Sequence, residues 1–192
     1  MLRPVLVTPP ATMPVSLAEA KAHCRVDHSD DDALITSMIV AATTYLDGWT
    51  GILGRALVTQ TWRQDFGSFR GCLRLPVGPV ASIDSVKHFD ADNSEQTVDP
   101  DVFVLWTDAR GSYVDLASGM AWPQAYDRPD AVRITYVAGD DAAAVPAPIK
   151  AAILLHVAHL YLNREAVVVG ETPSVQPMAA AALVAPYRRV GV

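Results

Sequence analysis

The sequence predicts an α+β protein with a helical core formed by N- and C-terminal helices and an inserted antiparallel β domain. Apolar residues recur at three- and four-residue spacing in Ser16–Trp49 and again in Pro146–Arg164, which indicates amphipathic helices. The residues between these stretches alternate in short segments of period two, which is typical of strands. Since each helical end needs an apolar partner, we expect residues 1–57 and 138–192 to form one helical core and residues 58–137 to form the inserted β subdomain.

The composition favours a compact protein that does not bind nucleic acid through general electrostatics. The chain has 192 residues, of which 51% are hydrophobic, enough to bury one sizeable core. Its formal net charge is −6, and among its 15 basic residues only Arg188 and Arg189 are adjacent. A surface that grips phosphates needs clustered Lys and Arg, so the composition argues against such a surface.

The sequence indicates neither secretion nor membrane insertion. Residues 1–11 contain one Arg and too short an apolar stretch for a signal peptide, and no run reaches the ~18 apolar residues of a membrane span. Cys24 and Cys72 fit no metal-binding spacing, and we expect both to be reduced and semi-buried. The protein is therefore expected in the cytoplasm or in a released particle, without a membrane partner.

Local signals predict the first elements of the chain. Four prolines in residues 1–14 predict an extended arm. Ser16 and Glu19 then form a capping box at the start of a short helix over Leu17–Cys24. The acidic stretch Asp27–Asp32 lacks the glycine and the distal glutamate of a calcium-binding loop. We expect an Asp or Ser of this stretch to cap the next helix instead.

The second helix is predicted from a longer apolar stripe and from the glycines that end it. The recurring apolar positions are Leu34, Ile35, Met38, Ile39, Ala42, Tyr45, Leu46 and Trp49. Gly48 and Gly51 supply the stop signal.

Short strands are predicted for the middle of the chain, arranged as an antiparallel meander or a small barrel-like sheet. The predicted strands are Val58–Phe66, Ile83–Phe89, Val102–Trp106, Ser112–Leu116 and Ala131–Tyr136. In the long loop before the last strand, Trp122 and Pro123 are expected to plug the open end of the sheet. A sugar-stacking role for this Trp is the alternative.

The last long helix begins at Pro146 and Pro148, because proline is tolerated in a first turn. Its predicted buried stripe, expected to pack against the second helix, contains Ile149, Ile153, Val157, Leu160 and Tyr161. His156 and His159 lie three residues apart and could share a metal ion, but no carboxylate follows at the spacing of a zinc motif. We expect hydrogen-bonded histidines there. A short Ala-rich helix over Met178–Ala185 follows.

The sequence resembles the head–tail connector (adaptor) proteins of long-tailed phages and of phage-derived gene transfer agents. The segments that carry this resemblance occur in family order along nearly the whole chain. They are Pro14–Lys21 with the helix start at Asp30–Asp32, Ala42–Trp49, Gly54–Trp62, Leu75–Ile83, Pro146–Lys150, Ala152–Ala166 and Leu183–Arg188. Residues 167–182 match less well.

The resemblance implies a structural role in the neck of a virion or gene-transfer particle. Such proteins form a ring of about a dozen subunits beneath the portal protein. The ring extends the DNA channel and carries a head-closure or tail component, while DNA passes through the lumen without specific binding. The resemblance also implies that the C-terminal segment docks on the portal, which assigns Pro186, Tyr187, Arg188 and Arg189 as docking residues. The alternative is that this segment folds back on its own subunit.

The residues themselves predict no catalytic, cofactor-binding or metal-binding site, and we expect a protein that is not an enzyme. Two alternatives from other classes remain. One is a ligand- or glycan-binding β module with Trp106 or Trp122 as stacking platforms. The other is a metal-assisted hydrolase with His156, His159 and an aspartate from 30–32. For the connector, we expect removal of residues 177–192 to abolish portal binding and to leave the thermal stability nearly unchanged.

Overall fold

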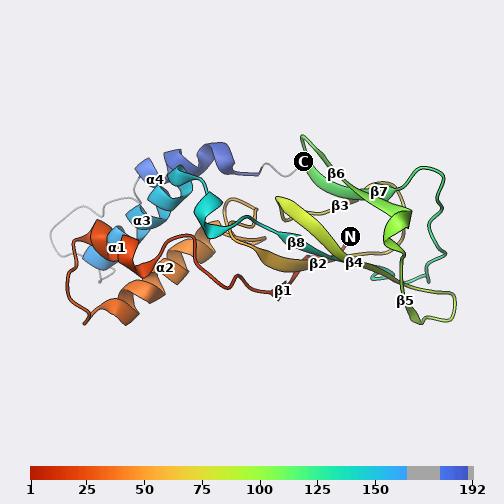
Figure 1. Ribbon diagram of the computed structural model, residues 1–192, viewed down its shortest axis with the longest axis horizontal. Coiled ribbons are helices and arrows are strands. Elements are labelled where there is room, and N and C mark those ends of the chain that lie inside the picture. Colours follow the sequence, from red (N-terminus) through yellow and green to blue (C-terminus); the bar gives the residue numbers. More distant parts are fainter. Residues whose placement is uncertain (164–177, 190–192) are drawn as a thin grey trace. The chain divides into compact units, whose positions relative to one another are not determined.

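The computed structural model describes residues 1–163 and 178–189, and they form two compact units (Figure 1). The β-rich unit contains residues 1–11 and 58–140, and the helical unit contains residues 12–57 and the described residues from 141 onward. The expected α+β class is confirmed by four α-helices and two antiparallel sheets in the described residues. The assignment of the two parts as domains stays a prediction.

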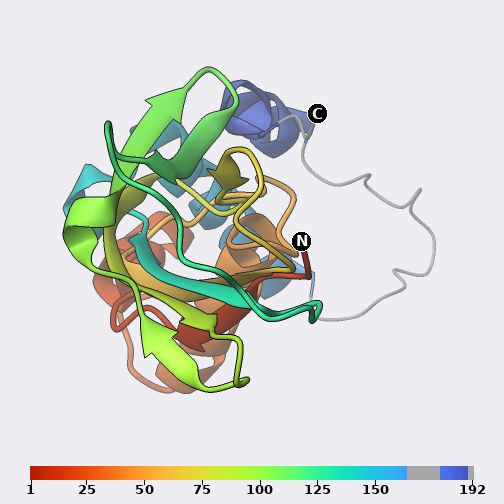
Figure 2. The ribbon, with the colours of Figure 1, turned by 90° about the vertical axis from the view of Figure 1, so that its right-hand side faces the viewer.

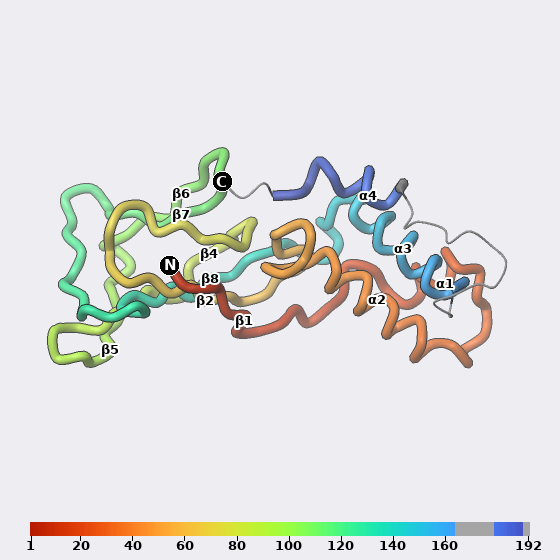
Figure 3. Tube along the Cα trace, turned by 180° about the vertical axis from the view of Figure 1, so that it is seen from behind, coloured from red at the N-terminus to blue at the C-terminus, as the bar shows by residue number. Residues whose placement is uncertain are grey.

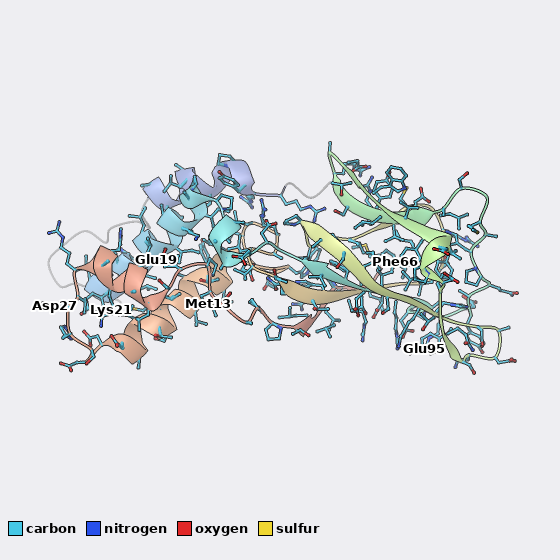
Figure 4. The ribbon with its side chains drawn as sticks, in the orientation of Figure 1. Met13, Glu19, Lys21, Asp27, Phe66 and Glu95 are labelled. Atoms are coloured by element: carbon cyan, nitrogen blue, oxygen red, sulfur yellow. The ribbon has the colours of Figure 1, made fainter. Side chains whose placement is uncertain are left out.

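The first helix starts as its local sequence predicts. Helix α1 spans Leu17–Cys24, and the hydroxyl of Ser16 accepts a hydrogen bond from the Glu19 amide at 3.2 Å. The Glu19 carboxylate in turn accepts from the Ser16 amide at 2.7 Å, so the predicted capping box is confirmed. Figure 4 labels Glu19 and Lys21 on this helix. The helix ends at Arg25, which has φ +57°.

Three further helices complete the helical unit. They are α2 (Asp32–Leu46), α3 (Ala147–Leu162) and α4 (Met178–Val184), and the short 3-10 helices Ala142–Ala144 and Ala185–Tyr187 accompany them. Helix α3 packs against the other three. The buried side chains at the centre of this packing are Ile35, Ile39, Leu46, Ile149, Ile153 and Val157. The predicted pairing of the second and the last long helix is therefore confirmed. None of the helices among the described residues is long and apolar enough to cross a membrane.

The acidic residues before α2 have a different role from the one predicted. Asp31 occupies the N-cap position but makes no capping bond. Its carboxylate accepts a hydrogen bond from the hydroxyl of Tyr161 at 2.6 Å, and Asp32 pairs with Lys21 at 2.6 Å. The expectation of a side-chain cap is wrong because these carboxylates bond to α3 and α1, whose positions a local motif does not reveal.

The predicted apolar stripes are also wider than the buried faces. Trp49 lies beyond the end of α2, and Trp49, Tyr45 and Leu160 are exposed. Tyr161 is half-buried, and its hydroxyl donates a hydrogen bond to the carboxylate of Asp31. A repeat of three and four residues locates a helix but does not show how much of its apolar surface the rest of the chain covers.

The β-rich unit contains two antiparallel sheets. The strands are β1 (Val5–Thr8), β2 (Gln60–Phe66), β3 (Leu73–Arg74), β4 (Val80–Phe89), β5 (Glu95–Thr97), β6 (Phe103–Asp108), β7 (Gly111–Leu116) and β8 (Val132–Ala138), with a 3-10 turn at Pro100–Val102. One sheet has the order β1-β2-β8-β4-β5 and the other the order β3-β7-β6. Figure 2 shows the β6–β7 hairpin (green) and β5 (yellow-green) on opposite sides of this unit.

The strands are not connected as a meander, so that expectation is wrong. The central partner of β2 is β8, which follows it only after five other strands. Residues 1–14, predicted as an extended arm, include strand β1, which pairs along the edge of β2 (Figure 3). Strands β1, β3 and β5 were not predicted, because two to four residues give too short a pattern to read.

The core of the β-rich unit comes from the alternate residues of its strands. In β2 the side chains of Trp62 and Phe66 are buried on one face, but Asp65 on the other face is buried as well, so the predicted alternation holds only in part; Figure 4 labels Phe66. In β8 the buried side chains are Val132, Ile134 and Tyr136. The hydroxyl of Tyr136 accepts a hydrogen bond from the amide of Val77 at 3.4 Å, which ties the segment after β3 to the larger sheet.

The β insertion closes where its two ends meet. Val58 and Asp140 form a bridge, and the Thr59 amide donates to the Asp140 carbonyl at 2.9 Å. Gly139 has φ +92°, and a Cβ atom there would overlap the carbonyl oxygen of Val58. Glycine is needed at this position because two backbones approach too closely for a side chain.

An ion-pair network covers one end of the larger sheet. Asp130 accepts from Arg128 at 2.7 Å and from Arg133 at 2.7 Å. The two guanidinium groups also lie 3.9 and 4.7 Å from the centre of the Phe89 ring. The hydrogen bond from Arg128, followed by that from Arg133, lowers the pKa of Asp130 from 3.8 to about 2.

We expect the Gly139→Ala variant to lower the free energy of unfolding by about 1–3 kcal/mol, because the added methyl group forces the two ends of the insertion apart. Urea titration of the full chain measures this change. Gly67→Ala is the matched control, since the nearest atom to its new Cβ is 3.6 Å away. Equal losses in the two variants would contradict the assignment.

Acid is expected to destabilise the fold through Asp130. Because its pKa is lower in the folded chain, the carboxylate stabilises the fold fully above the ordinary value of 3.8, and this contribution is lost as the pH falls toward about 2. The urea midpoint measured between about pH 5 and pH 2 should therefore fall less in Asp130→Asn than in the unmodified chain. The exposed Asp84→Asn is the control, and an undiminished fall in Asp130→Asn would refute the prediction.

Candidate partner-binding site

The four predicted docking residues lie together at the end of the helical unit. They follow α4 through the 3-10 turn Ala185–Tyr187. Pro186 and Arg188 are exposed, whereas Tyr187 and Arg189 are half-buried. The turn is closed by the Arg188 amide, which donates to the Ala185 carbonyl at 3.3 Å. The structure thus brings the predicted residues together as one short segment.

Backbone contacts fix the position of this segment on its own unit. The Arg189 amide donates to the carbonyl of Leu53 at 2.9 Å. Leu53 is held in turn because its amide donates to the carbonyl of Leu46, the last residue of α2, at 3.2 Å. Gly51 permits this return of the chain, since a Cβ atom there would overlap the carbonyl oxygen of Asp47. Residues 185–189 therefore fold back on the loop after α2 of their own unit, as the alternative stated from the sequence expects, and docking on the portal stays a proposal.

The helix before the docking segment belongs to the core of the unit. Ala180 and Val184 of α4 are buried, and α4 packs against α3. The expectation that removal of residues 177–192 leaves the stability unchanged is therefore wrong, because the deletion takes away buried side chains. The part of that range outside the described residues carries no structural statement.

The exposed part of this segment is suited to binding a carboxylate. Within residues 1–163 and 178–189, Arg188 takes part in no ion pair. A guanidinium group recognises a carboxylate through two parallel hydrogen bonds. Tyr187 adds an aromatic ring beside it. Such Tyr and Arg side chains are frequent anchors of protein interfaces.

The residues of the alternative metal-assisted hydrolase do not come together as a metal centre. His156 packs edge-on against the ring of Tyr45 at 5.4 Å, and burial lowers its pKa. His159 lies 3.3 Å from the side chain of Asn163. Asp31 accepts a hydrogen bond from Tyr161, and Asp32 pairs with Lys21. No group of three or more His, Cys, Asp or Glu residues in the described chain is placed to hold a metal ion.

The two candidate stacking tryptophans differ in their surroundings. Trp122 stacks on Phe69 with 4.5 Å between ring centres and 9° between ring planes, so one face of its ring is already covered. Trp106 on β6 is 53% exposed and lies opposite Tyr113 of β7. Arg74 lies 5.1 Å from the Tyr113 ring and makes two hydrogen bonds, of 3.0 and 2.6 Å, to Asp108.

A groove between α2 and α3 was missed by the sequence analysis. This α2–α3 groove has a volume of about 300 Å³ and is lined by Leu34, Ser37, Met38, Ala41, Leu160 and Asn163. The signal was present in the apolar stripe of α2, which is wider than a single buried face needs. Leu34, Met38 and Tyr45 lie beside the core residues Ile35 and Ile39 but are not buried.

The chain resembles known connector and neck proteins. Residues 14–95 match the model of a family described as phage gp6-like head-tail connector protein. A chain in the neck of an empty gene transfer agent (GTA) particle, computed with C6 symmetry, is 25% identical with a TM-score of 0.77; all of this chain and 97% of that chain are covered. A chain in the virion of a native GTA particle gives the same values.

Another comparison supports the fold alone. A chain in the neck of a native GTA particle, computed with C12 symmetry, is 24% identical with a TM-score of 0.68, and 97% of each chain is covered. No curated protein matches the chain. The sequence match over residues 14–95 and the full-length structural match confirm the resemblance to head–tail connector proteins stated from the sequence, and the chain has the fold of a chain from the neck of a gene transfer agent particle.

Proposed function

We propose that this chain is a structural subunit of a ring beneath the portal, where it extends the DNA channel and joins capsid to tail. The observation that carries this proposal is the full-length likeness to a chain in the neck of a GTA particle with cyclic symmetry. The family role is structural rather than enzymatic, and the proposed role requires no bond to be made or broken. The site of action is the particle neck, after assembly in the host cytoplasm.

The portal is the proposed partner of Pro186, Tyr187, Arg188 and Arg189. The exposure of Pro186 and Arg188 supports this assignment, whereas the hydrogen bond from the Arg189 amide to Leu53 holds the segment on its own unit. Because the segment is held by its own unit, the portal would meet a preformed surface and little ordering entropy would be lost on binding. The charge of Arg188 favours an acidic segment of the portal as the contact.

The other proposed partners follow from the ring. Copies of the chain would meet through heterologous interfaces, since a closed ring joins one surface of each subunit to a different surface of the next. A head-closure or tail component would bind on the side away from the portal. DNA would pass through the lumen without specific binding, because about a dozen chains of net charge −6 carry roughly −70 in total.

We expect Arg188→Ala to weaken portal binding about tenfold or more, the effect of losing a charged anchor of an interface, and to leave the melting temperature unchanged. Binding to the purified portal of the same particle can be measured by biolayer interferometry over a range of salt concentrations. Arg70→Ala, at an exposed position of the β-rich unit, is the matched control. Unchanged affinity in Arg188→Ala, or an equal loss in the control, would contradict the docking assignment.

A further inference from the structure

The α2–α3 groove is an apolar surface that the described residues of the helical unit leave uncovered. None of its lining residues is charged. Leu160 in the lining is itself exposed, and the same two helices carry two further exposed apolar side chains, Tyr45 of α2 and Leu162 of α3, the latter 80% exposed. Exposed apolar patches of this kind mark interaction sites on soluble proteins. Without a cation in its lining, the groove is not suited to phosphates and needs an apolar occupant.

Strand β1 is a second apolar surface on the same chain. Val5, Leu6 and Val7 are 42%, 43% and 51% exposed, so the strand presents apolar side chains on both faces. It lies at the edge of the larger sheet, beside β2, with no strand on its other side in the described chain (Figure 3). Pro4 and the proline after Thr8 limit its length, a device that protects edges from uncontrolled strand pairing. The exposed side chains of β1 can still contact another protein surface.

A second copy of the chain is the occupant that fits the groove. This step rests on the proposed function, in which copies surround the neck axis. The chain offers an apolar groove on α2 and α3 and an exposed apolar edge strand in the β-rich unit. Two different surfaces that complement each other are what a heterologous ring contact requires. The likeness to a chain in a neck computed with C6 symmetry supports the presence of a neighbouring copy beside each subunit.

We propose that β1 of one subunit packs in the α2–α3 groove of the next subunit around the ring. In this contact the exposed side chains of Val5, Leu6 and Val7 cover Leu34, Met38 and Leu160. Each copy gives its strand to one neighbour and receives a strand from the other. The contact is head-to-tail, so neither surface binds its own equivalent on another copy.

Disulfide trapping of the full chain tests this contact, because it accumulates even a weak association. In a background of Cys24→Ala and Cys72→Ser, Ser37→Cys places a thiol in the groove, and Val7→Cys places one on β1. Under mild oxidation a mixture of the two single variants should give dimers only, and the double variant should give a ladder of dimers, trimers and larger species. Val5→Cys repeats the test from a second exposed position on the strand.

Matched controls separate the specific contact from random collision. Ser37→Cys combined with Ala109→Cys, at an exposed turn of β6–β7, should remain at least tenfold slower to cross-link. Ala41→Glu in the groove should suppress the ladder, whereas Thr36→Glu, on an exposed face of α2 away from the groove, should not. Melting curves of the two glutamate variants establish that both are folded.

Several results would overturn the proposal. Ser37→Cys alone giving dimers as fast as the mixture would indicate a groove-to-groove contact. A control pair that cross-links equally fast, or folded β1 and groove variants that give no ladder, would remove the contact altogether. If trapping fails while Arg188→Ala still weakens portal binding, only this inference is wrong. If portal binding by the unmodified chain is also absent, the proposed function fails as well.

Discussion

The antiparallel pairing of β2 with β8 brings the two ends of the inserted segment to the same place. Thr59 and Asp140 meet there, and Gly139 leaves room for the backbone of Val58. Because the chain leaves the helical unit and returns at adjacent points, α2 and α3 can pack although about a hundred residues separate them. The buried contacts of Ile35 and Ile39 with the α3 side of the core depend on this closure.

The helices of the helical unit carry more apolar surface than its described core buries. One face of α2 supplies Ile39 and Leu46 to the core, while Leu34 and Met38 line an open groove. In a protein that acted alone this surplus would be an aggregation hazard. In the proposed ring this surplus apolar surface would be covered by neighbouring copies. The helices would then serve both the fold and the proposed assembly.

Local chemistry determined which elements could be predicted. The capping box of Ser16 and Glu19 is complete within four residues, so the start of α1 could be read directly. Asp31 could not be read in this way, because its partner Tyr161 lies 130 residues away. Strand β1 also depends on a distant partner. The docking residues were predicted from a resemblance, and the sequence alone did not indicate that Arg189 is anchored on Leu53.

The distribution of basic residues connects the acidic composition with the proposed role in a particle neck. Arg74 donates hydrogen bonds to Asp108 and thereby lowers the pKa of that carboxyl to about 2. Arg128 and Arg133 donate in the same way to Asp130. Guanidinium groups engaged in this way stabilise the β-rich unit and are not available to phosphates. Arg188 has no acidic partner within the described residues. If the chain lines a DNA conduit as proposed, its wall should repel the polymer, so the Arg188 cation is better placed at the proposed contact with a protein partner than in the lumen.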